Sequence, residues 1–339
     1  MMTRPAIEVV HIGSACRDIA PDDPRGWRIG GGVMYAALTT ARLGLRTAAV
    51  VGVDAAAAEA SELEQLRDAG VDLLRVPLTE GPIYHNVETA TGRVQTCVQP
   101  GVPLPIPTLA PDWLAAPGWS VVPVAGEVHD EWAEVVPPDA HVAVAWQGLL
   151  RVLRAGERVR QLPPRPSPVL ARADLIGVSR HDVAPDVALH KLWELLSPAA
   201  DLLITQGAEG GLLIRLGDDG PAEMLRYRSP ASDREIDPTG AGDTFLAALH
   251  ASGVRAPRDA PAEGAARRVA IRAALDLRFA AAAGSLVVED WGLSGVADLA
   301  ATQARFARDA APGAVAPVPA EEARRYWPEE PATEAPASA

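Results

Sequence analysis

The sequence predicts an α/β fold with a mainly parallel sheet covered by helices. Short apolar runs alternate along the chain with segments of helical periodicity, and this alternation is typical of strand–helix–strand units. The chain has 339 residues, of which 48% are hydrophobic and 22% are charged. This composition suits a globular protein with one large core or two modest ones.

The N-terminal part alternates strands and helices from its first residues. A capping-box pattern runs from Ser61 to Glu64, and Gly70 is placed to end the helix that this box would begin. We expect strands at 7–13, 46–52 and 71–76 and helices at 35–43 and 61–69.

Two extended segments then interrupt the alternation. Residues 82–89 and 93–98 are rich in β-branched side chains and flank Ala90-Thr91-Gly92, which predicts a hairpin. Further along we expect strands at 120–124, 141–145, 175–178 and 202–205, and helices at 186–196, 241–251 and 263–283. The last segment, 328–339, is mostly Pro, Ala and Glu, so we expect a disordered tail.

The charge of the chain restricts its partners. A formal net charge of -13 opposes binding to nucleic-acid phosphates or to an anionic membrane, since both require a basic face. The only lysine, Lys191, follows no glycine-rich loop, which excludes a P-loop. We expect a small-molecule substrate, with no nucleic acid and no membrane as partner.

The cysteine content and the first residues indicate the compartment. Two cysteines, Cys16 and Cys97, are too few for a disulfide framework or a structural zinc site, and we expect two packed thiols instead. The N-terminus runs into a strand pattern without the apolar core of a signal peptide. We therefore expect a cytoplasmic protein.

The run DPTGAGD, from Asp237 to Asp243, has the composition of a phosphate-handling turn. The small residues Gly240, Ala241 and Gly242 let backbone N–H groups approach an anion, and the helix that begins there adds the positive end of its dipole. The Asp243 carboxylate lies beside the same place and can accept a proton from an attacking hydroxyl. The alternative is a glycine-rich turn in which the two aspartates only cap the helix.

Four other motifs precede this run along the chain. A glycine pair, Gly30-Gly31, precedes Val51-Gly52-Val53-Asp54, and ADLIGVSRHD (173–182) precedes LLITQGAEGG (202–211). With DPTGAGD, these motifs resemble the PfkB, or ribokinase-like, carbohydrate kinases over about residues 7–300. The resemblance implies a three-layer sandwich over 1–327, a small β lid from segments near 14–30 and 80–101, and phosphoryl transfer from ATP with Mg²⁺.

The resemblance also implies roles for individual residues. Asp243 would be the base, and Gly240 to Gly242 would form the anion hole. Asp243 would serve as base because of its position and would not need a raised pKa. Asp18 would bind sugar hydroxyls, with a loop cap as the alternative. Gly30 and Gly31 would let the main chain pass close to the substrate, or would only begin a helix.

The nucleotide side of the resemblance is carried by a second set of residues. Thr205, Gly207 and Gly210 would form the loop beneath ATP. The acidic motif, usually Asn-x-x-Glu, here has Ser179 and Asp182, which would orient Mg²⁺ through water or would only cap a helix. Asp237 resembles the monovalent-cation site of some relatives, which would take K⁺.

Departures from the common pattern suggest the substrate. Tyr35 stands where many family members have Asn, and its ring either stacks on a sugar or packs in the core. Gln147 and Arg151 either reach substrate or phosphate or cover the end of the sheet. With these positions the chain is most similar to the myo-inositol kinase branch, so a cyclitol is the preferred acceptor.

Two alternative functions remain open at this level. A nucleoside kinase of the same fold is the nearest one. A nucleotide- or sugar-binding sensor without turnover is the alternative of another class, and the altered acidic motif is its reason. An exposed lid edge could also pair two subunits into a homodimer, although no residue requires it.

Overall fold

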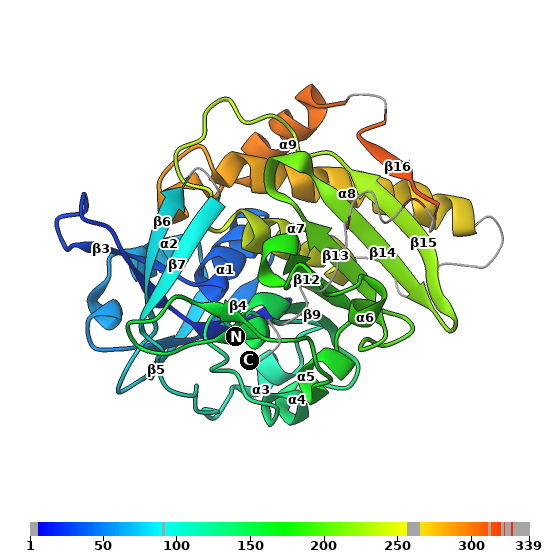
Figure 1. Cartoon of the computed structure of the whole chain (residues 1–339). Helices are drawn as coiled ribbons and strands as arrows, with labels where there is room; N and C mark the ends of the chain where they lie inside the picture. Colours follow the sequence, from blue (N-terminus) through cyan, green and yellow to red (C-terminus); the bar gives the residue numbers. More distant parts are fainter. Residues whose placement is uncertain are drawn as a thin grey trace, which may run out of the picture.

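A central sheet of ten strands runs through the part of the chain that the computed structural model describes, residues 6–89, 92–255, 265–310, 313–319, 322 and 327 (Figure 1). Seven neighbouring strands are parallel, and three antiparallel strands extend one edge. Their spatial order is β16 (Val315–Pro317), β15 (Gly220–Tyr227), β14 (Gly211–Gly217), β13 (Asp201–Thr205), β12 (Leu175–Ser179), β9 (His141–Ala145), β8 (Gly118–Val121), β1 (Val9–Ser14), β4 (Thr47–Val53) and β5 (Asp72–Pro77).

Alternating strand residues face two separate cores. On β1, Val9 belongs to one buried cluster and Val10 to the other, as the period of two in a strand requires. The first cluster is covered by α1 (Gly32–Arg42), α2 (Glu62–Asp68), α7 (Ala241–Val254) and α8 (Ala265–Val287), with α9 (Leu299–Arg308) packed on α8.

Short helices cover the opposite face of the sheet. They are α3 (Pro111–Leu114), α4 (Trp132–Val135), α5 (Pro168–Ala171) and α6 (His190–Trp193). Bulky residues compensate for the short helices, because Trp119, Trp132, Trp146 and Trp327 are fully buried in this cluster. The predicted fold class, a mainly parallel sheet between two helical layers, is confirmed.

A second sheet lies at one end of the central sheet, opposite β14 and β15 (Figure 1). Its four strands, in the order β3 (Trp27–Gly30), β2 (Cys16–Ile19), β6 (Ile83–Thr89) and β7 (Gly92–Gln99), come from the two segments in which we expected a lid. We call this the lid sheet. A short pair, β10 (Arg151–Val152) and β11 (Arg160–Gln161), forms a third sheet, and the segment between its strands is hydrogen-bonded to β7.

Two predicted helices differ from those observed. Ser61 has helical backbone angles and its side chain makes no capping bond, so the predicted capping box is absent. The predicted helix 186–196 shrinks to α6, whose neighbouring turns use i to i−3 bonds such as Leu192 N–H to the Leu189 carbonyl. One reason is that the Val187 carbonyl accepts the Trp327 indole N–H at 2.8 Å.

Three other observations bear on the sequence predictions. In the described residues, no helix is both long and apolar enough to cross a membrane. Cys16 and Cys97 are both buried free thiols, as we expected. The predicted tail at 328–339 lies outside the described residues.

Candidate active site

The DPTGAGD turn leads directly into α7, which begins at Ala241. Gly240 is the N-cap residue and has a left-handed φ of 82°, and a side chain there would overlap the Tyr35 ring. Only glycine meets both conditions at little energetic cost. The first N–H groups of α7 have no partner within the helix, so the turn presents donors and a positive dipole end to the adjacent space.

Asp243 lies in the first turn of α7 and is partly buried. Its pKa is raised to about 6, first by burial and then by the nearby negative charge of Asp182, while Arg151 acts in the opposite direction. Sequence reasoning required no such shift. A carboxyl group with a pKa near 6 is a stronger general base than an ordinary aspartate, while it is still mostly ionised at neutral pH.

The predicted substrate anchor, Asp18, lies on β2 of the lid sheet and is partly buried. Its Oδ1 accepts a hydrogen bond from Asn86 Nδ2 at 3.0 Å, and its Oδ2 lies 3.8 Å from Cys16 Sγ. The Oδ2 atom also lies against Gly30, where a side chain would overlap it. The carboxylate is therefore held on both sides.

A strip of three glycines, Gly30 to Gly32, connects the anchor to the helix turn. Gly30 lies against the Asp18 carboxylate, and a Cβ at Gly32 would come within 2.8 Å of Asp243 Oδ1. Gly31 has a φ of 107° and lies against the Ser14 carbonyl, where a Cβ would be only 2.5 Å from the oxygen. Since two residues of extended chain span at most about 7 Å, the two carboxylates lie against the two ends of one short backbone segment.

Tyr35 follows the core-packing alternative. The residue is 1% exposed and lies in the core cluster beneath Gly240. The phenol ring fills the space that the missing side chain of Gly240 leaves, as the core-packing alternative expects. The ring packs against the backbone of the turn at Gly240.

Gln147 and Arg151 converge on the acidic motif. Gln147, in the 3-10 turn η2 (Trp146–Leu150), donates to Asp182 Oδ1 at 3.0 Å, and Arg151 NH2 lies 3.9 Å from the same oxygen. Arg151 also donates to the Val124 carbonyl at 3.1 Å and is 11% exposed. This guanidinium is close enough to Asp243 to lower its pKa, so it places a positive charge beside the candidate base.

Ser179 and Asp182 form a capping box in the 3-10 turn η3 (Arg180–Asp182). The Ser179 hydroxyl accepts the His181 N–H at 3.3 Å, and Asp182 Oδ2 accepts the Ser179 N–H at 3.2 Å. Each carboxylate oxygen has a second lone pair for a metal-bound water. A Mg²⁺ ion held mainly by phosphates and water would need only such outer contacts from the protein. In the described residues no group of three or more His, Cys, Asp or Glu could hold a metal ion.

Thr205, Gly207 and Gly210 lie at the adjoining strand end. Thr205 is the last residue of β13 and pairs with Ser179, the last residue of β12. The 3-10 turn η4 (Gly207–Glu209) follows, bounded by left-handed glycines with φ of 56° and 93°. The predicted nucleotide loop and the predicted metal motif therefore lie at the same edge of the parallel sheet, where ligands of such sheets commonly bind.

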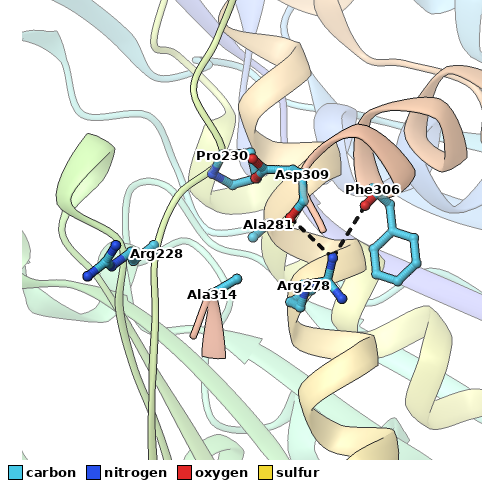
Figure 2. A pocket seen from close by; sticks show the side chains of 7 residues that line it. All are labelled: Arg228, Pro230, Arg278, Ala281, Phe306, Asp309 and Ala314. Atoms are coloured by element: carbon cyan, nitrogen blue, oxygen red, sulfur yellow. Dashed lines mark hydrogen bonds between the residues drawn. The ribbon is translucent and has the colours of Figure 1, made fainter. Parts of the chain in front are cut away.

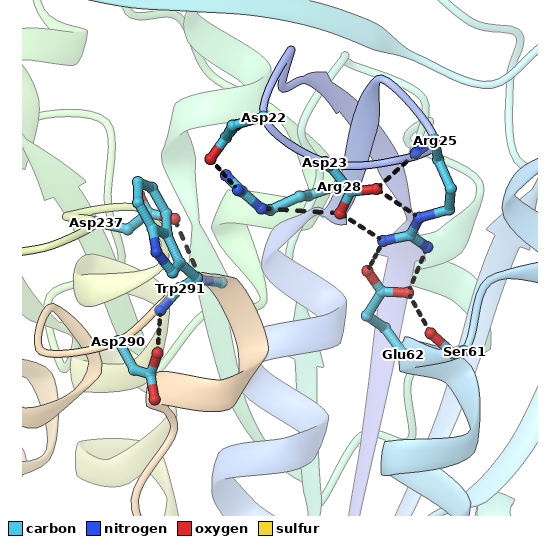
Figure 3. A network of polar contacts seen from close by, with 10 residues as sticks. Asp22, Asp23, Arg25, Arg28, Ser61, Glu62, Asp237, Asp290 and Trp291 are labelled. Atoms are coloured by element: carbon cyan, nitrogen blue, oxygen red, sulfur yellow. Dashed lines mark hydrogen bonds and ion pairs between the residues drawn. The ribbon is translucent and has the colours of Figure 1, made fainter.

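Asp237 holds two loops together. Its Oδ1 accepts the Thr239 N–H at 2.9 Å, and its Oδ2 accepts the Gly292 N–H at 3.2 Å. The residue before Gly292, Trp291, is 47% exposed and lies under the lid residue Arg28, whose guanidinium carbon is 4.3 Å from the ring centroid (Figure 3). The dipeptide 291–292 therefore contacts both the lid sheet and the DPTGAGD turn.

Sequence reasoning missed several residues of this region. Asn86 and Gln95 belong to the expected hairpin, but no motif distinguishes them. Glu127 is 3% exposed and accepts backbone N–H groups, from Ser14 at 2.9 Å and from Ala125 at 2.8 Å. It fixes the loop after β8, and a lone loop glutamate carries no sequence signal for such a role.

A small pocket lies outside this arrangement (Figure 2). It is lined by residues of α8, α9 and the β15 end, where Arg278 donates to the carbonyls of Phe306 and Asp309 at 3.4 and 3.2 Å. Its volume of about 10 Å³ suits one water molecule. None of the predicted site residues lines it.

Comparison with known proteins identifies the fold. No protein-family model matches the chain, and no curated protein matches its sequence. Among solved structures, ribokinase from Giardia lamblia is 16% identical, with 89% of this chain and 99% of that chain covered and a TM-score of 0.65.

Two ligand complexes are also similar. A pyrophosphate-dependent ribokinase-family kinase complexed with a pyrophosphate analog and myo-inositol is 18% identical, covering 87% of this chain and 99% of that chain, with a TM-score of 0.62. Ribokinase from Arabidopsis thaliana, complexed with ribose and ATP, is 17% identical with a TM-score of 0.59 and covers 89% and 99% of the two chains. The chain therefore has the ribokinase fold.

Proposed function

We propose that this protein is a kinase of the ribokinase family that phosphorylates one hydroxyl group of a small polyol or sugar. The observation that carries the proposal is the Gly30–Gly32 strip, which lies against the Asp18 carboxylate at one end and the Asp243 carboxylate at the other. An acceptor hydrogen-bonded to Asp18 would then place a hydroxyl within reach of a base whose pKa is about 6.

The surroundings of Asp18 favour a neutral, polyhydroxylated acceptor. The polar groups of Asp18, Asn86 and Gln95 form a row across the lid sheet. The Asn86 amide lies 3.0 Å from the Asp18 carboxylate and 2.7 Å from the Gln95 amide. The Asp18 carboxylate at the end of this row can accept hydrogen bonds from more than one hydroxyl. Myo-inositol or a related cyclitol is our preferred acceptor, and the similar structure that holds myo-inositol supports this choice.

The reaction would be an in-line displacement. The acceptor oxygen forms a bond to the terminal phosphorus of the donor, the bond to the leaving phosphate oxygen breaks, and the acceptor proton passes to the Asp243 carboxylate. Negative charge on the transferred group would be stabilised by the first N–H groups of α7 and by the Arg151 guanidinium. The lid sheet would exclude water, which otherwise competes as acceptor.

We propose ATP as donor, bound over the Thr205–Gly210 loop, with Mg²⁺ oriented through water by Asp182 and Ser179. The ion would offset the phosphate charge. The Asp237 loop is our proposed place for K⁺, and activity in K⁺ compared with Na⁺ checks that assignment. Since one similar structure is of a pyrophosphate-dependent kinase, pyrophosphate is the competing donor.

The test is a matrix of donors and acceptors. ATP and pyrophosphate are each incubated with myo-inositol, ribose, inosine and cytidine, and the phosphorylated product is followed by ³¹P NMR. Product from a polyol or sugar supports the proposal, whereas product from nucleosides alone would make the protein a nucleoside kinase. Binding of acceptor or nucleotide by calorimetry without product from any pair would favour a sensor.

A further inference from the structure

Resting on the proposed function, we propose that Asn86 and Gln95 of the lid hairpin are positioning residues that orient the Asp18 carboxylate for the acceptor. The two residues are directly opposed on β6 and β7. Neither belongs to a motif, and neither was predicted to act in the site.

The three side chains form a directional chain of hydrogen bonds. Gln95 Nε2 donates to Asn86 Oδ1 at 2.7 Å, and Asn86 Nδ2 donates to Asp18 Oδ1 at 3.0 Å. An amide has an accepting end and a donating end, so a donor on the oxygen of Asn86 leaves its NH₂ group for the carboxylate. Gln95 therefore holds the Asn86 amide in the orientation that the Asp18 carboxylate requires.

Strand periodicity places this chain of bonds on the inner face of the lid sheet. Tyr84 and Asn86 alternate along β6 with His85 and Val87, and the latter two are exposed. Tyr84 is 1% exposed and donates to the Val124 carbonyl at 2.8 Å, so its side of the strand faces the protein. The polar groups of Asn86 and Gln95 are thus partly buried, and in such surroundings an unmatched hydrogen bond costs more than in water.

Loss of either amide disturbs Asp18 in a specific way. Without the Asn86 donor, the Asp18 carboxylate loses the bond on Oδ1 while Cys16 Sγ and Gly30 still confine Oδ2. Without Gln95, the Asn86 amide loses the bond on its oxygen and is less firmly held against the carboxylate. Both changes should weaken acceptor binding, and neither removes a group from the donor side.

The experiment measures Kd for myo-inositol by calorimetry, together with KM for acceptor and donor, in Asn86→Leu, Gln95→Leu and the double variant. The matched control is His85→Ala, which alters the outer face of the same strand. We expect the acceptor Kd and KM to rise about tenfold in Asn86→Leu and by less in Gln95→Leu. The donor KM should stay within twofold, and the double variant should match Asn86→Leu alone because the two residues act in series.

The outcomes separate this inference from the proposed function. A wild-type protein that binds and phosphorylates myo-inositol while the variants keep its acceptor Kd overturns the inference alone. Additive effects in the double variant, or an equal effect of His85→Ala, also overturn it. A wild-type protein that neither binds nor phosphorylates any polyol or sugar overturns both proposals.

Discussion

Replacing Asp243 by Asn separates catalysis from stability at the centre of the site. The variant keeps the shape of the side chain but cannot take up the acceptor proton, so kcat should fall by about 10²–10⁴. Raising the carboxyl pKa from 3.8 to about 6 corresponds to about 3 kcal/mol of unfavourable free energy in the ionised form. The neutral amide removes that penalty, so the variant should be more stable than wild type at neutral pH.

The sign of this effect follows from proton binding. Between pH 4 and 6 the folded protein holds the Asp243 proton more tightly than the unfolded chain does, so the wild-type free energy of unfolding decreases as pH rises through this window. Above pH 6 the decrease is complete. The stability gain of Asp243→Asn should therefore appear between pH 4 and 6 and remain constant above it, with a rise in Tm of about 4 °C for a chain of this length.

Two measurements check this prediction. Differential scanning calorimetry from pH 4 to 8 compares wild type, Asp243→Asn and the control Asp219→Asn, which alters an exposed loop carboxylate. Steady-state kinetics of the wild type should show kcat/KM falling about tenfold per pH unit below pH 6. A variant that retains activity within tenfold of wild type, or a variant without added stability at pH 8, would refute the reasoning.

Three further predictions concern the neighbours of this carboxylate. Asp182→Asn removes a negative charge that raises the Asp243 pKa, so the acid limb of kcat/KM should move to lower pH; a limb at the wild-type position contradicts this. Gly240→Ala adds a methyl group that overlaps an aromatic ring, whereas Gly70→Ala has a similar φ of 84° in open space. Denaturant unfolding should show a loss for the first variant that exceeds the loss for the second by at least about 1 kcal/mol. Trp291→Ala removes the ring beneath the lid arginine, so the acceptor KM should rise about threefold at unchanged kcat, and equal kinetics in both proteins would count against this contact.

The sequence allowed the parallel part of the fold to be predicted because its local signals agree with the tertiary structure. Buried parallel strands are continuous apolar runs, and β9 begins and ends where the pattern predicted. The antiparallel pair β14 and β15 was missed, since Gly211–Tyr227 mixes charged and apolar residues without strict alternation. The prediction of a helix at 186–196 failed for another reason. The Trp327 indole N–H, which is distant in sequence, bonds to the Val187 carbonyl that a regular helix would use.

The candidate site was predictable where chemistry depends on a short motif. The turn before Asp243 and the glycine pair at Gly30 were visible as sequences, and in the structure Gly32, which follows that pair, lies against the Asp243 carboxylate. The amide chain through Asn86 was not visible, because its bonds join residues that are brought together only by strand pairing. The raised pKa of Asp243 was equally hidden, since it is caused by burial and by the charge of Asp182, which is far away in the sequence but near in the structure.

The dipeptide Trp291–Gly292 contacts both the lid sheet and the turn that we propose as the donor site. Its ring supports Arg28 of the lid, and its backbone holds Asp237 of the turn that would receive the donor. Any preference of the closed lid for one arrangement of that turn is a coupling free energy, and such coupling is reciprocal. With such coupling, each substrate would change the affinity for the other by the same factor, so the stability of the ternary complex would not depend on the order of binding.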